Sequence, residues 1–133
     1  LKILRPIPKE QNRYLEHALD MWKMLHGDTY AFERERVGAT LVKAHQRCFY
    51  PAGVKRQTSA IIASPDRTGD LRNLNVPTLV LHGDNDPLVP LACGLATAEA
   101  VPHSKLKVYK GMGHTLPREL WSEMIEEICN IAS

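Results

Sequence analysis

The sequence contains little that would suit a membrane protein, a nucleic-acid-binding protein or a disulfide-stabilised fold. Three cysteines lie far apart without a CxxC spacing, at positions 48, 93 and 129. Because an odd number cannot pair fully within one chain, we predict a reducing, cytoplasmic compartment. No apolar run approaches the roughly 18 residues that span a bilayer. The 17 basic and 15 acidic residues form no block of like charge, which argues against a nucleic-acid or anionic-membrane partner.

The composition instead favours a compact globular chain. Of 133 residues, 44% are hydrophobic, which is enough for one domain with a real core. The chain starts at Leu1 without a charged-then-apolar leader, so we expect any targeting signal to lie upstream.

Residues 1–65 show only helical periodicity. Apolar residues recur every three or four positions from Tyr14 to Leu25, and Gly27 is a suitable stop. Asp28 or Thr29 could cap a second helix, which Gly38 would weaken. A third is expected over residues 52–63, because Pro65 disfavours helical geometry at the residue before it. We interpret this region as a helical block.

Residues 66–133 alternate between strand and helix. After a short helical turn in "DLRNL", strands are expected over residues 78–82 and 105–110 and helices over residues 91–101 and 117–132, with Pro117 at the first position of the last helix. This order describes a two-strand parallel βαβα unit. Parallel strands are normally buried in larger sheets, so partner strands should come from elsewhere.

Two loops after these strands carry the chemical information. In "HGDNDPLVP", Gly83 permits a sharp exit from the strand and Pro87 keeps Asp86 extended, with its carboxylate directed away from any helix cap. Taken alone, this loop is more simply interpreted as a strand-to-helix turn, because Asp and Asn tolerate turns. In "KGMGHTLP", two glycines let the backbone bend before His114. A lone histidine is more often structural or exposed than catalytic.

Considered together, the two loops indicate a catalytic pair. Both follow strands of one parallel sheet, and the carboxyl ends of such strands meet at one edge. Asp86 and His114 should therefore lie close together. An aspartate that orients a histidine is part of a nucleophile–base–acid triad.

With these motifs the sequence resembles the carboxyl-terminal half of an α/β-hydrolase. The resemblance rests on "VPTLVLHGDNDPLVP", "KLKVYKGMGHTLP" and the last amphipathic helix, and it extends to "YPAGVKRQTSAIIASPDRTGDLRNL" in bacterial esterase- and lipase-like members related to aclacinomycin methylesterase. It implies a truncated α/β-hydrolase fold, with a cap over 1–65 and part of the core over 66–133. It further implies that Asp86 is the triad acid, His114 the base and Asp84 a variable turn residue.

The sequence departs from the family in lacking G-x-S-x-G. None of its serines is expected on a strand-to-helix elbow (Ser59, Ser64, Ser104, Ser122 and Ser133). We therefore predict a fragment of a carboxylesterase-like serine hydrolase that is inactive alone and acts, in the whole protein, on a small ester-like substrate. The exposed sheet edge should promote homo-oligomers or strand exchange.

Other interpretations stay open. The chain could be a non-catalytic relative that binds a ligand or partner, or a helical interaction module followed by a small βαβ unit. Aromatic and methionine side chains of the first helices could line a substrate pocket or simply pack in the core. His82 should pack at its strand end, and the other histidines show no metal-ligand spacing, so we predict neither metal nor cofactor. Fold alone does not select the substrate.

Overall fold

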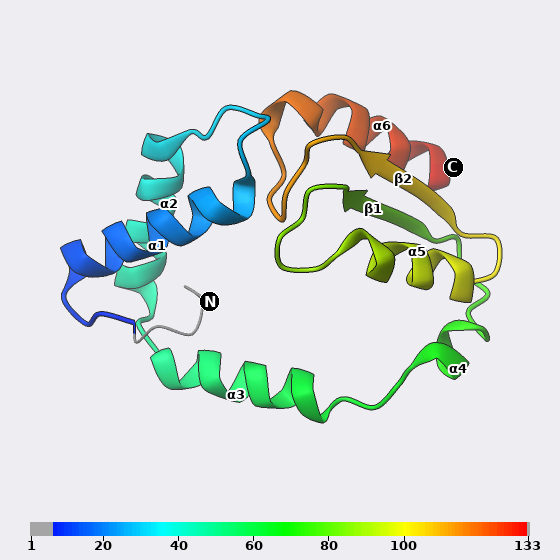
Figure 1. The fold of residues 1–133 in the computed structure, drawn as a ribbon, viewed down its shortest axis with the longest axis horizontal. Coiled ribbons are helices and arrows are strands. Elements are labelled where there is room, and N and C mark those ends of the chain that lie inside the picture. Colours follow the sequence, from blue (N-terminus) through cyan, green and yellow to red (C-terminus); the bar gives the residue numbers. More distant parts are fainter. Residues whose placement is uncertain (1–6, 133) are drawn as a thin grey trace. The chain divides into compact units, whose positions relative to one another are not determined.

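The computed structural model describes residues 7–132, and Ser133 lies outside this range. The chain forms two compact units (Figure 1). The first contains the residues up to Lys23 together with Glu33–Pro65, and the second contains Met24–Phe32 together with Asp66–Ser133. The end of the first helix and the loop that follows it are thus part of the second unit.

The first unit is helical. It consists of most of α1 (Gln11–His26), α2 (Arg34–Arg47) and α3 (Pro51–Ala63). The Glu10 carboxylate begins α1 by accepting hydrogen bonds from the backbone N–H groups of Asn12 and Arg13, at 2.8 and 2.9 Å, which satisfies donors that a helix start leaves unpaired. Among the described residues of this unit, the buried apolar side chains are Ala18, Leu19 and Leu41.

The second helix begins later than the sequence indicated. Residues 28–33 are irregular, and α2 begins at Arg34 rather than after Asp28 or Thr29. Gly27 follows the last residue of α1 and has φ 79°. This left-handed conformation is common for glycine at the end of a helix. The residues that follow are held by tertiary hydrogen bonds in the second unit, described below, and these override local helix propensity.

The second unit contains the predicted parallel βαβ arrangement. β1 (Leu79–Gly83) and β2 (Lys105–Tyr109) pair in parallel, with Leu79 opposite Lys105 and Gly83 opposite Tyr109. α5 (Leu91–Ala100) connects them, as the sequence predicted. The short α4 (Thr68–Leu71) begins earlier than "DLRNL" suggested, because the Asp66 carboxylate accepts hydrogen bonds from the Thr68 backbone and hydroxyl.

The last helix starts differently from the prediction. Pro117 is fully buried with an extended backbone, and the first turn is the 3₁₀ helix η2 (Arg118–Leu120), followed by α6 (Trp121–Ala132). Met124 packs with Tyr109 and Met112 in the core of the unit. Along the same predicted apolar face, Ile125 and Ile128 stay exposed, since two strands cover only part of it. Within residues 7–132, no helix combines the length and apolar character required to cross a membrane.

Candidate active site at the carboxyl ends of the strands

The loops that follow β1 and β2 are joined by backbone hydrogen bonds. Asp84 N–H donates to the Tyr109 carbonyl at 3.2 Å, and Asn85 N–H donates to the Met112 carbonyl at 3.1 Å. The approach is so close that a Cβ on Gly83 would overlap the Met112 carbonyl oxygen. Gly83 is therefore required for this contact, a reason different from the sharp exit predicted for it.

Asp84 also joins the two loops, although the sequence indicated only a turn residue. Its Oδ1 accepts a hydrogen bond from the Gly111 N–H at 2.5 Å. Gly111 has φ 74°, a conformation that glycine adopts without steric cost. The Asp84 carboxylate thus fixes the start of the loop that carries His114.

Asp86 and His114 lie side by side, as the parallel topology predicts. Oδ2 of Asp86 and Nδ1 of His114 are 2.7 Å apart. The other oxygen of Asp86 accepts hydrogen bonds from the backbone N–H groups of Leu88 and Val89, at 2.8 and 2.9 Å. The N-cap of α5 is Pro90 and not Asp86, so one oxygen of the Asp86 carboxylate holds the turn and the other holds the histidine.

The electrostatics of the pair define which imidazole nitrogen carries the proton. Burial of Asp86 raises the pKa of its carboxyl group, but hydrogen bonds from Val89, His114 and Leu88 and the charge of His114 outweigh burial, so the pKa lies below its usual 3.8. Asp86 is then an ionised carboxylate at neutral pH and can only accept. It follows that Nδ1 of His114 donates, and that in the neutral ring Nε2 carries the lone pair.

Exposure differs sharply between the two side chains. That of Asp86 is 6% exposed, whereas that of His114 is 38% exposed. A hollow of about 210 Å³ lies beside the pair and is lined by residues of both loops and of β1. The arrangement therefore presents a histidine, oriented by a shielded carboxylate, at an open hollow.

His82 packs at the end of its strand, as predicted. Its Nε2 lies 2.9 Å from the Val89 carbonyl oxygen. Gly94 of α5 lets the helix pack closely on this ring, since a Cβ there would lie 2.6 Å from its Nδ1. His82 therefore supports the loop of Asp86, and its ring is not positioned to act as a base.

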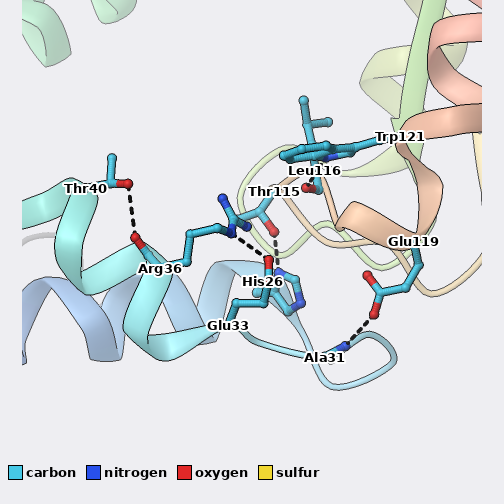
Figure 2. A network of polar contacts seen from close by, with 9 residues as sticks. All are labelled: His26, Ala31, Glu33, Arg36, Thr40, Thr115, Leu116, Glu119 and Trp121. Carbon is cyan, nitrogen blue, oxygen red and sulfur yellow. Dashed lines mark hydrogen bonds and ion pairs between the residues drawn. The ribbon is translucent and has the colours of Figure 1, made fainter.

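One group of contacts, made by residues 24–32, was not predicted from any sequence pattern. The Leu25 carbonyl accepts a hydrogen bond from His114 N–H at 2.7 Å. Figure 2 shows two further links: His26 Nδ1 lies 2.6 Å from Thr115 Oγ1, and Ala31 N–H donates to Glu119 at 3.2 Å. In the sequence, only the glycine spacing of "KGMGH" indicates these contacts, because a Cβ on Gly113 would overlap the Leu25 carbonyl.

Neither a serine nor a metal-ligand cluster completes the site within the described chain. The residues that line the hollow include no serine. Ser64 and Ser104 instead donate to backbone carbonyls, those of Ala60 and Ala98. From residue 7 to residue 132, no group of three or more His, Cys, Asp or Glu side chains could hold a metal ion.

Comparison with known proteins establishes the family. The family model described as serine aminopeptidase, S33, matches residues 5–120, which is most of the chain. The chain belongs to this family of α/β-hydrolases. The truncated α/β-hydrolase fold predicted from the two motifs is therefore confirmed.

Relatives of this chain include named enzymes. It is 48% identical over 50 residues to the non-heme chloroperoxidase CPO-A1 of Kitasatospora aureofaciens, covering 37% of the chain and 18% of that protein. It is 34% identical over 96 residues to the bifunctional esterase/perhydrolase DCH of Acinetobacter calcoaceticus, covering 68% and 35%. Among solved structures, the esterase RhEst1 from Rhodococcus sp. ECU1013 superposes with a TM-score of 0.66 at 21% identity, covering 96% of this chain and 44% of that one. The chain thus spans less than half of the length of each of these three proteins.

Proposed function

We propose that Asp86 and His114 are the acid and base of an ester-hydrolysing triad whose nucleophile and oxyanion donors come from residues outside this sequence. The observation that supports this most directly is the 2.7 Å bond from Nδ1 of His114 to the ionised Asp86. It leaves Nε2, the nitrogen that a triad aims at its nucleophile, on an exposed ring.

In the proposed reaction, Nε2 removes the proton of the nucleophile's hydroxyl group as the hydroxyl attacks the ester carbonyl. The resulting imidazolium ion is stabilised by the Asp86 carboxylate. Nε2 then gives the proton to the departing alcohol, and a water molecule deprotonated in the same way releases the acid. This chain contributes proton transfer and its orientation, while the oxygen nucleophile is supplied by another segment.

The substrate class that we propose is a small carboxylic ester. It is supported by the Acinetobacter relative, which is named an esterase/perhydrolase. The closer resemblance to relatives of aclacinomycin methylesterase remains a prediction, as do a cap function for residues 1–65 and a cytoplasmic location. The three cysteines are exposed.

The test uses the longest open reading frame that encodes these residues. We expect it to contain a strand-to-helix elbow with a nucleophile and to hydrolyse nitrophenyl acetate. His114→Ala should lower kcat by about 10⁴-fold or more, the usual effect of removing a triad member. His103→Asn is the matched control, because His103 is exposed before β2 with φ 59°, a conformation that Asn tolerates.

The 133-residue chain alone should not hydrolyse the ester above background. If the chain turns over and His114→Ala abolishes the turnover, the nucleophile lies within it and the proposal of an external nucleophile is wrong. If the full reading frame has no elbow nucleophile and no turnover, the non-catalytic binding function replaces the enzymatic one.

We also propose that the chain alone self-associates. Large apolar side chains of its second unit remain exposed, among them Leu95, Ile125 and Ile128, and such patches favour association. Light scattering should show a mass that rises with concentration for the chain alone and less so for Ile128→Lys. A monomer at all concentrations would contradict this.

A further inference from the structure

Residues 24–32, hereafter the clamp segment, contact the loop of the candidate base at several points. We infer that this segment is a positioning element for His114 and that His26 is its main positioning residue. The inference rests on the proposed function of His114, which it deepens by naming what holds the base in place. The segment belongs to the same compact unit as that loop.

The clamp segment contacts the loop of His114 at two further places. Next to the base, the Leu25 carbonyl accepts a hydrogen bond from His114 N–H at 2.7 Å, and Gly113 lies so close that a Cβ would overlap the carbonyls of Leu25 and His26. At the start of the loop, the Tyr30 hydroxyl donates a hydrogen bond to the Lys110 carbonyl at 2.9 Å. The loop therefore has little freedom to shift relative to the segment.

His26 is the one buried polar side chain of this contact. It is 6% exposed, its ring packs edge-on against Phe32 with centroids 5.4 Å apart, and its Nδ1 lies 2.6 Å from Thr115 Oγ1. Its Nε2 is buried without a hydrogen-bond partner among the described residues. A buried unpaired nitrogen costs free energy, so an apolar ring would suit packing better. Unlike an apolar ring, histidine supplies a hydrogen bond to Thr115, the residue that follows His114.

Three contacts thus orient His114. Asp86 holds its ring, Leu25 holds its backbone N–H, and His26 holds the next residue through Thr115. The ring can keep Nε2 directed at a nucleophile only if the backbone that carries it is fixed as well. A displacement of about 1 Å can lower a rate by about a hundredfold, so the clamp segment has a direct influence on proton transfer.

The experiment removes only the Thr115 hydroxyl, in the natural polypeptide that contains these residues. Thr115→Val preserves the shape, Thr115→Ser preserves the hydroxyl, and Thr97→Val is the matched control, because the Thr97 hydroxyl bonds only within its own helix, to Cys93. His26→Phe removes the other partner and serves if Thr115→Val does not fold. Three quantities are measured: amide exchange at His114, the imidazole ¹⁵N signals of His114, and kcat and KM.

For Thr115→Val and His26→Phe we expect His114 amide exchange to accelerate about three- to tenfold, the effect of one lost buried hydrogen bond. A second set of His114 ring signals should appear, and kcat should fall about tenfold or more with KM within about twofold. Thr115→Ser should resemble the wild type. The inference is overturned if Thr115→Val matches Thr97→Val in all three measurements.

Failure of the proposed function would be visible separately. If the wild type has no esterase activity but the exchange and ring signals respond as described, the clamp segment positions His114 and the proposed reaction is wrong. If the wild type is active and Thr115→Val changes neither kcat nor the spectra, the reaction stands and the positioning role is rejected.

Discussion

Replacing Asp86 with asparagine tests whether a charge holds the two loops together. The asparagine amide keeps an oxygen for the N–H groups of Leu88 and Val89, which lie 2.8 and 2.9 Å from Oδ1 of Asp86. Toward His114, however, the amide presents an NH₂ group to the donating Nδ1. Two donors would then face each other, and the ring must change its tautomer or move.

The expected cost follows from the geometry of the pair. A hydrogen bond to a charged group contributes about 1.5–3 kcal/mol. Because the His114 ring is 38% exposed, solvent screening reduces this, and we expect Asp86→Asn to lower the free energy of unfolding by about 1–2 kcal/mol at pH 7. The control Asp84→Asn, on the same loop, leaves the Asp86–His114 bond intact and should cost less.

The pH dependence gives the sharper test. The pKa of Asp86 in the folded chain lies below 3.8, whereas in an unfolded chain it is about 3.9. Its contribution is therefore present above the unfolded value and is lost as the pH falls through the folded one. In urea unfolding at several pH values, the penalty of Asp86→Asn relative to Asp84→Asn should shrink below about pH 4. An equal penalty at pH 7 and pH 3, or none at pH 7, would refute the reasoning.

Two further predictions concern packing and are checked by urea unfolding. Gly113→Ala should lower the free energy of unfolding by more than about 2 kcal/mol, because its Cβ would overlap the Leu25 carbonyl. Gly69→Ala, where a Cβ would meet nothing within 4 Å, should be neutral or slightly stabilising, and equal losses in the two variants would contradict the close approach. Met124→Ala should cost about 2–5 kcal/mol, since Met124 is 4% exposed. Ile125→Ala, on the same helix but 59% exposed, should cost less than about 1 kcal/mol, and a reversed order would mean that α6 packs through its other face.

Local signals located most of the helices and strands. Pro65 and Gly27 end helices where expected, and β1 and β2 lie within one residue of the predicted strands. These boundaries depend on backbone conformations that particular residues favour or exclude, so they can be read from short stretches. The start of α2 could not be predicted from a short stretch, because residues 28–33 are held by hydrogen bonds to distant residues such as Lys110 and Glu119.

The sequence alone determined that Asp86 and His114 would meet, because two parallel strands joined by one helix bring their following loops to the same edge. Only the tertiary structure decided how they meet. It divided the Asp86 oxygens between a turn and an imidazole, made Asp84 a link between loops, and placed His26 against Thr115 across 89 positions of sequence. Such contacts depend on which backbones approach one another in space, and no local pattern of residues encodes that distance.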